Sequence, residues 1–205
     1  MKKVVILDYG VGNMGSVQKA LTHLGLTPII SKDIKDITNC DLLVMPGQGA
    51  FETAMQNLHK NNLIDPVKTH IQAQKPFLGI CVGFQILFEE SSEKGQHNGL
   101  GIFPGKLKKF PKSTLKVPHM GWNTLSIEND PLSLGTKLKK EDSVYFVHSY
   151  YLENTAPDII FTQTEYGASF VSAIQTNTLL ATQFHPEKSG DVGLTLLETF
   201  FKNIG

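Results

Sequence analysis

Residues 77–88 read FLGICVGFQILF, an apolar run that is interrupted by a cysteine between two glycines. The part before Cys81 has the pattern of a buried strand, and the part from Val82 to about Glu90 has that of a helix. Gly79 and Gly83 suit a sharp strand-to-helix turn, because small neighbours leave room for a nucleophile in a strained backbone. The stretch is therefore a cysteine version of the nucleophile elbow G-x-S-x-G. The alternative is that Cys81 is an ordinary buried core thiol.

Strand-like and helix-like segments alternate around this stretch. We expect strands at residues 3–8, 28–31, 41–45 and 76–80, and helical spacing at 17–24, 51–58 and 64–71. This β-α-β-α order favours a parallel sheet with helices on both faces. The second half contains short strand-like runs at 124–127, 143–151, 159–164, 170–175 and 179–184, and an amphipathic helix at 194–204. The sequence thus predicts an α/β fold in a single domain over residues 1–205. Its mostly parallel central sheet is flanked by helices and joined to an additional β-rich C-terminal half.

The segment QFHPEKS, residues 183–189, offers a base for the thiol. His185 and Glu187 follow an apolar strand and are two residues apart, so in extended backbone their side chains point the same way. The carboxylate could then orient the imidazole and stabilise its positive charge. Cys81, His185 and Glu187 are therefore a candidate catalytic triad.

The composition excludes several functional classes. Lys+Arg and Asp+Glu balance at 19 each, and all the basic residues are lysines, so no strong field favours nucleic acid or an anionic membrane. We find no signal peptide and no apolar segment long enough to span a bilayer, and expect a cytoplasmic protein. Cys40 and Cys81 are the only cysteines, and both are expected to be reduced thiols.

No metal and no cofactor is expected. Two cysteines far apart in the sequence do not form a zinc knuckle. His185-Pro186-Glu187 matches the H-x-E half of a zinc deaminase site, but the cysteines that should follow it are absent.

The stretch ILDYGVGNMGS near the N-terminus raises the hypothesis of a dinucleotide site. Gly10, Gly12 and Gly15 have the G-x-G-x-x-G spacing, and Asp33 lies about where a ribose-binding acid is expected. However, Asp8 would place a carboxylate beside the phosphates, where repulsion weakens binding.

The chain resembles the class I glutamine amidotransferases, which share an elbow G-I-C-x-G-x-Q and a C-terminal H-P-E. These correspond to GICVGFQ at 79–85 and QFHPEKSG at 183–190. Within this class the chain is similar, nearly end to end, to the glutaminase subunits of imidazole glycerol phosphate synthase. Four segments carry the second resemblance: DYGVGN (8–13), PGQGAF (46–51), PHMGWN (118–123) and YFVHSYY (145–151).

The resemblance implies that Cys81 attacks the side-chain amide of glutamine. His185, held by Glu187, protonates the departing ammonia and then activates the water that hydrolyses the glutamyl thioester. The oxyanion would be held by backbone N–H groups of Val82, Gly47, Gln48 and Gly49. The polar ends of glutamine would be held by Gln85, Glu93, His148, Ser149 and Tyr150.

The resemblance also implies a partner, a (β/α)₈ cyclase subunit that receives the ammonia in a heterodimer and makes imidazole glycerol phosphate and AICAR in histidine biosynthesis. The DYGVGN turn would face this subunit, and its glycines would serve backbone geometry. The positions expected near the interface are Asn13, Met120, Trp122 and Tyr145. Packing in the core is the alternative for the last three. The absence of arginine agrees with a partner that binds the phosphorylated substrate.

One departure keeps other hypotheses open. This chain has Gln48 where the family usually has a small apolar residue. The same glutaminase chemistry could therefore serve a cyclase-like amidotransferase of bacterial surface-sugar biosynthesis. Two further alternatives are a non-catalytic regulatory module of the same fold and a cysteine hydrolase or peptidase that acts without a partner.

Overall fold

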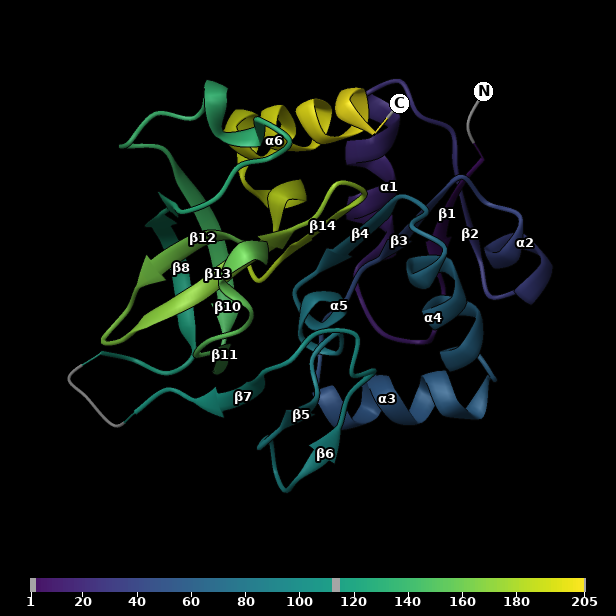
Figure 1. Ribbon diagram of the computed structural model, residues 1–205, viewed down its shortest axis with the longest axis horizontal. Coiled ribbons are helices and arrows are strands. Elements are labelled where there is room, and N and C mark those ends of the chain that lie inside the picture. The colour runs from purple at the N-terminus through teal and green to yellow at the C-terminus, as the bar shows by residue number, and fades with distance from the viewer. Residues whose placement is uncertain (1–2, 112–114, 205) are drawn as a thin grey trace.

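The apolar runs of the N-terminal half form a parallel sheet that is buried on both faces. The computed structural model describes residues 3–111 and 115–204 (Figure 1). The elements of this half are β1 (Val4–Leu7), α1 (Met14–His23), β2 (Pro28–Ser31), α2 (Ile34–Thr38), β3 (Leu42–Met45), α3 (Phe51–Lys60), α4 (Ile64–Gln72), β4 (Phe77–Ile80) and α5 (Val82–Gln85). Every residue of β1, β3 and β4 is buried, as expected for parallel strands with helices on both sides.

The second half supplies most of the antiparallel strands. Its elements are β5 (Glu90–Ser91), β6 (His97–Asn98), β7 (Lys106–Lys109), β8 (His119–Thr124), β9 (Ser126–Ile127), η1 (Leu134–Lys137), β10 (Ser143–His148), β11 (Tyr150–Leu152), η2 (Pro157–Ile159), β12 (Ile160–Glu165), β13 (Ser169–Gln175), β14 (Leu179–Thr182), η3 (Pro186–Lys188) and α6 (Gly190–Asn203). In Figure 1, α1 and α6 lie on one side of the parallel strands, and α3 and α4 on the other. The predicted fold class is confirmed. No helix in the described part of the chain is long and apolar enough to cross a membrane.

The position of β14 brings the two halves of the predicted site together. The main sheet has the order β2-β1-β3-β4-β14-β13-β11-β7-β5-β6, and β14 pairs parallel to β4. Their register places Thr182 beside Ile80, so both strands end at the same edge of the sheet. The Cys81 N–H donates to the Thr182 carbonyl at 2.7 Å. The elbow and the H-P-E segment therefore leave neighbouring strand ends.

The predicted helix from Val82 to about Glu90 is wrong in its length, because α5 ends at Gln85. The carbonyls that would continue the helix bond instead to a later loop: Leu100 N–H to Ile86 O at 2.7 Å, and Ile102 N–H to Leu87 O at 2.9 Å. The apolar run is buried by this loop, and local periodicity does not reveal such burial.

The ribbon of β8 and β10 also differs from the expected strands. The strand predicted at 124–127 is found in part, as the short β9 (Ser126–Ile127), whereas β8 (His119–Thr124), which pairs antiparallel with β10, was not predicted. The expected run at 143–151 is divided at Ser149 into β10 and β11, which belong to different sheets. The motif 118–123 lacks an apolar run, so its pairing in a strand comes from the partner strand rather than from local propensity.

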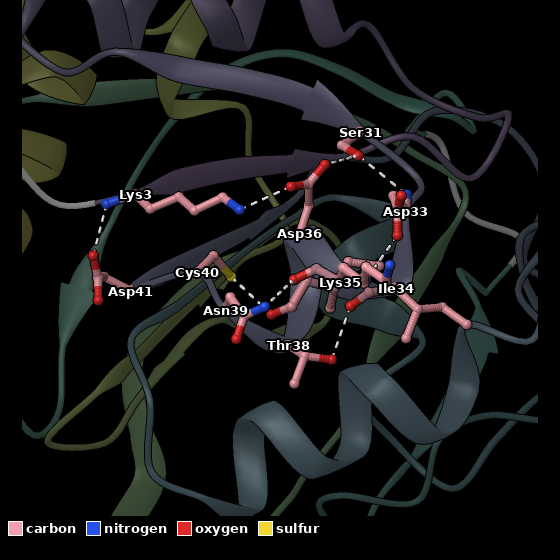
Figure 2. A network of polar contacts seen from close by, with 11 residues as sticks. Lys3, Ser31, Asp33, Ile34, Lys35, Asp36, Thr38, Asn39, Cys40 and Asp41 are labelled. Atoms are coloured by element: carbon pink, nitrogen blue, oxygen red, sulfur yellow. Dashed lines mark hydrogen bonds and ion pairs between the residues drawn. The ribbon is translucent and has the colours of Figure 1, made fainter.

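The sequence analysis did not predict α2, and the structure shows what Asp33 does there (Figure 2). Its carboxylate caps the helix by accepting from the Lys35 N–H at 2.8 Å. Next to it, Asp36 accepts from the Ser31 hydroxyl at 2.7 Å and from Lys3 Nζ at 2.8 Å. These hydrogen bonds, that from Lys3 first, lower the pKa of Asp36. Asp33 is thus a helix cap, which accounts for its position without a nucleotide.

The close approach of the elbow to β3 leads to a test of stability. A Cβ built on Gly83 would lie 1.9 Å from the Met45 carbonyl oxygen, so Gly83→Ala should lower the free energy of unfolding by about 3 kcal/mol. A Cβ on Gly15, another helical glycine, meets no atom nearer than 3.9 Å, so Gly15→Ala should raise it by up to about 1 kcal/mol. Urea unfolding followed by circular dichroism measures both changes. Equal midpoints for the two variants would contradict this packing.

Candidate active site

Cys81 lies in a strained turn at the carboxyl end of β4. Its backbone has φ +55° and ψ −106°, a conformation that L-residues rarely adopt. A Cβ on Gly79 would lie 2.8 Å from the Gly83 carbonyl oxygen, so both glycines of the predicted elbow are required by close packing. The side chain of Cys81 lines a cavity of about 320 Å³. The elbow is confirmed as a structural element.

His185 and Glu187 form the expected pair. His185 Nδ1 lies 2.9 Å from Glu187 Oε1, and both side chains are only 2% exposed. The carboxylate can only accept, so Nδ1 carries the proton. Of the three residues His185, Pro186 and Glu187, only His185 has extended backbone, because η3 begins at Pro186. A short helical turn, not the predicted extended strand, brings the carboxylate back to the ring.

The other imidazole nitrogen is free for chemistry. Within the described residues, His185 Nε2 is buried and makes no hydrogen bond, although His185 and Cys81 line the same cavity. Burial lowers the pKa of His185, but the neighbouring Cys81 thiol and Glu187 carboxylate outweigh it and raise the pKa to about 9. The charged imidazolium is therefore favoured at neutral pH, beside the sulfur that it would support as a thiolate.

The second thiol has a different environment. Cys40 is buried near His70, with Sγ and Nδ1 3.8 Å apart. Burial raises the pKa of Cys40 to about 11, and burial lowers the pKa of His70. Both groups are therefore held in their neutral forms. Lys75, whose Nζ donates to the Cys40 carbonyl at 3.3 Å, lowers the pKa of the thiol, but burial outweighs it.

The segment Gly47–Gly49 passes directly beside the elbow. A Cβ on Gly47 would lie 2.5 Å from Val82 Cβ, so only glycine allows this approach. Among the hydrogen bonds of residues 3–111 and 115–204, none uses the N–H of Gly47, Gln48 or Gly49. The N-terminus of α5 at Val82 has no side-chain cap. Unused donors thus lie on both sides of the thiol, as an oxyanion hole requires.

The DYGVGN turn packs against the segment Gly47–Gly49 and the residue before it. The buried Tyr9 hydroxyl donates to the Pro46 carbonyl at 2.5 Å, and a Cβ on Gly12 would lie 3.3 Å from the Gly47 Cα atom. Burial, with a smaller effect of Cys81, raises the pKa of Tyr9, which keeps its proton. The sequence analysis missed Tyr9, although it lies inside a quoted motif.

The cavity beside Cys81 collects the residues that were expected to contact glutamine. Besides Cys81 and His185, it is lined by Gln48, Gly49, Val82, Gln85, Glu93, Pro118, Val147, His148, Ser149 and Tyr150. Gly47 and Glu187 are not part of the lining. A larger open groove of about 620 Å³ lies elsewhere, along β9 and β12, and neither cysteine nor histidine lines it.

The lining side chains of Glu93 and Gln85, like those of the histidines, also bind protein groups. Glu93 Oε2 accepts from the Phe51 N–H at 2.8 Å, at the start of α3. Gln85 Nε2 donates to Gln183 Oε1 at 2.9 Å and to the Tyr150 carbonyl at 3.3 Å. Gln183 Nε2 lies 3.8 Å from the Cys81 sulfur, and the sequence analysis assigned it no role. Gln85 thus has its amide nitrogen committed to the pocket wall.

The four expected interface residues lie outside the cavity. Met120 and Trp122 are 63% and 58% exposed, so packing in the core is wrong for both. Trp122 meets Tyr145 edge-on at 6.0 Å, and Tyr145 is half-buried. Asn13 is exposed and caps α1 by accepting from the Ser16 N–H at 3.2 Å.

Coupling between thiol and imidazole can be measured by alkylation. At pH 7.5, His185→Ala should slow the reaction of Cys81 with iodoacetamide about tenfold, because the sulfur loses the neighbouring imidazolium that would stabilise its thiolate. Glu187→Gln should slow it less, because the carboxylate orients the base without holding the sulfur itself. Cys40→Ala serves as the control and should react as wild type does. Identical rates in all four proteins would show that the pair is not coupled.

Known proteins resemble this chain over nearly its whole length. A family model described as glutamine amidotransferase class-I matches residues 5–204. The imidazole glycerol phosphate synthase subunit HisH of Aquifex aeolicus is 46% identical, over 97% of this chain and 95% of its own length. The subunit of the same name from Methanosarcina barkeri is 45% identical, over 98% of each chain. In fold, the chain resembles the structure of PurLQS from Thermotoga maritima, with a TM-score of 0.75, 16% identity and full coverage of both chains. The chain belongs to the class I glutamine amidotransferase family.

Proposed function

We propose that this chain is the glutaminase subunit of an imidazole glycerol phosphate synthase and supplies ammonia to a cyclase subunit in histidine biosynthesis. The observation that carries the proposal is that Cys81, His185 and an uncommitted backbone segment meet at one cavity. The full-length similarity to subunits named HisH favours this pathway over surface-sugar biosynthesis. Gln48 was the only indication of that alternative.

The chemistry follows from the geometry of the triad. The Cys81 thiolate attacks the side-chain amide carbon of glutamine, and the N–H groups of Val82 and of the segment Gly47–Gly49 stabilise the resulting oxyanion. His185 donates its Nε2 proton to the nitrogen, and the C–N bond breaks to release ammonia. His185 then takes a proton from water, and the hydroxide cleaves the glutamyl thioester to glutamate. Glu187 keeps Nδ1 protonated throughout.

The segment Gly47–Gly49 also provides a means of control. An oxyanion donor contributes only when its N–H faces the tetrahedral oxygen, and rotation of one peptide turns it away. The DYGVGN turn contacts this segment through Tyr9 and Gly12. A partner that binds this turn could therefore set the orientation of the segment. Gln48 lies at its centre and lines the cavity.

The surface around β8 fits a partner. Met120 and Trp122 expose large apolar side chains, and such exposure often marks a protein interface. Pro118 lines the glutamine cavity and also, with Met120, an adjoining surface groove, so this face borders the site of ammonia release. We propose that the cyclase subunit docks here. The two cysteines are free thiols, which agrees with the reducing cytoplasm as the location.

The proposal predicts a separation of two activities in the complex with the cyclase subunit. Cys81→Ala should abolish synthesis from glutamine and leave synthesis from added ammonia at the wild-type rate, because only the nucleophile is lost. Cys40→Ala, the matched control, should retain both activities. Loss of the ammonia-dependent reaction in Cys81→Ala, with assembly intact, would show that Cys81 is structural.

A further inference from the structure

A chain of side-chain hydrogen bonds connects β8 to the wall of the glutamine cavity. His148 Nδ1 lies 2.9 Å from the Tyr150 carbonyl oxygen, and His148 Nε2 lies 3.2 Å from His119 Nδ1. His119 Nε2 lies in turn 3.4 Å from Asn123 Nδ2. His148 and Tyr150 line the cavity, whereas His119 and Asn123 do not. The catalytic steps above use neither of the latter two.

Backbone groups fix the orientation of the Asn123 amide. The Thr124 N–H can only donate, and it lies 2.9 Å from Asn123 Oδ1. The Glu165 carbonyl can only accept, and it lies 2.9 Å from Asn123 Nδ2. The amide therefore cannot be reversed, and its second N–H is directed at His119 Nε2. This nitrogen must accept and carries no proton.

The orientation of the Asn123 amide fixes which nitrogen carries the proton in His119 and in His148. With Nε2 unprotonated, neutral His119 carries its proton on Nδ1 and donates it to His148 Nε2. His148 must then carry its own proton on Nδ1, which donates to the Tyr150 carbonyl. A further proton on either ring would set two donors against each other. Burial also favours the neutral rings, because it lowers the pKa of His119 to about 4 and that of His148 to about 3.

The same strand carries the exposed apolar face. Side chains alternate along β8, so buried His119 and half-buried Asn123 lie on the inner side, while Met120 and Trp122 lie on the outer side. The register of β8 with β10 places His119 opposite His148. One strand thus joins the outer surface to the wall of the cavity.

We propose that His119 is a positioning residue for glutamine. By donating to His148 Nε2 it supports the tautomer whose Nδ1–H donates to the Tyr150 carbonyl, and this hydrogen bond connects the wall of the cavity to β8. The inference rests on the proposed function, because it requires glutamine to bind in this cavity.

Two substitutions separate positioning from packing. The His119 ring stacks on Phe146 at 4.7 Å and on Tyr166 at 3.9 Å, so His119→Phe keeps the stacking and removes the donor. His119→Asn loses the stacking but can place an N–H near the position of Nδ1. In the complex with the cyclase subunit, His119→Phe should raise KM for glutamine about tenfold, with kcat and ammonia-dependent synthesis nearly unchanged. His119→Asn should stay within about threefold of wild type. His70→Phe, which removes a buried histidine elsewhere, is the control and should leave KM unchanged.

A second measurement needs neither the partner nor glutamine. Nitrogen-15 NMR of the wild-type chain at pH 7 should show His148 protonated at Nδ1 alone. His119→Phe should shift the Nε2 resonance of His148, because this nitrogen loses its donor while the Tyr150 carbonyl still accepts from Nδ1. A wild-type His148 protonated at Nε2 would overturn the inference, and so would a larger rise in KM for His119→Asn than for His119→Phe. Failure of the wild-type complex to use glutamine would instead contradict the proposed function, while the NMR result would still decide the tautomer.

Discussion

The proposed active site depends on backbone packing that leaves no room for side chains. The turn that carries Cys81 lies so close to β3 that a Cβ on Gly83 would overlap the Met45 carbonyl oxygen, and one on Gly47 would overlap Val82. These contacts hold Cys81, the proposed nucleophile, close to the adjacent segment Gly47–Gly49. The strained dihedral angles of Cys81 persist because the surrounding packing leaves no relaxed alternative.

Electrostatic interactions determine which histidine near Cys81 carries a positive charge. Parallel pairing of β14 with β4 places His185 beside the thiol. Cys81 and the buried Glu187 side chain together raise the pKa of His185. The other two histidines near the cavity, His119 and His148, are held neutral by their hydrogen bonds and by burial. Positive charge is thus concentrated on the one imidazole that can support a thiolate and protonate a leaving amine.

The sequence predicted the parallel sheet, the elbow and the His185–Glu187 pair, because each depends on local pattern: continuous apolar runs, glycine spacing and a short motif. It did not predict the end of α5 at Gln85, since a loop distant in sequence takes the helix carbonyls. The support from Tyr9 and the partners of His119 were missed for the same reason. Hydrogen bonds between distant segments leave no periodic signal in a single sequence.

We propose that Cys81 acts at full rate only when an N–H of the segment Gly47–Gly49 faces the oxyanion. The most direct test is the rate of glutamine hydrolysis by this chain alone and in complex with the cyclase subunit and its bound substrate. Loss of one oxyanion donor costs roughly 100- to 1000-fold, so the isolated chain should be slower by about that factor. Hydrolysis by the isolated chain at the rate of the full complex would contradict the account.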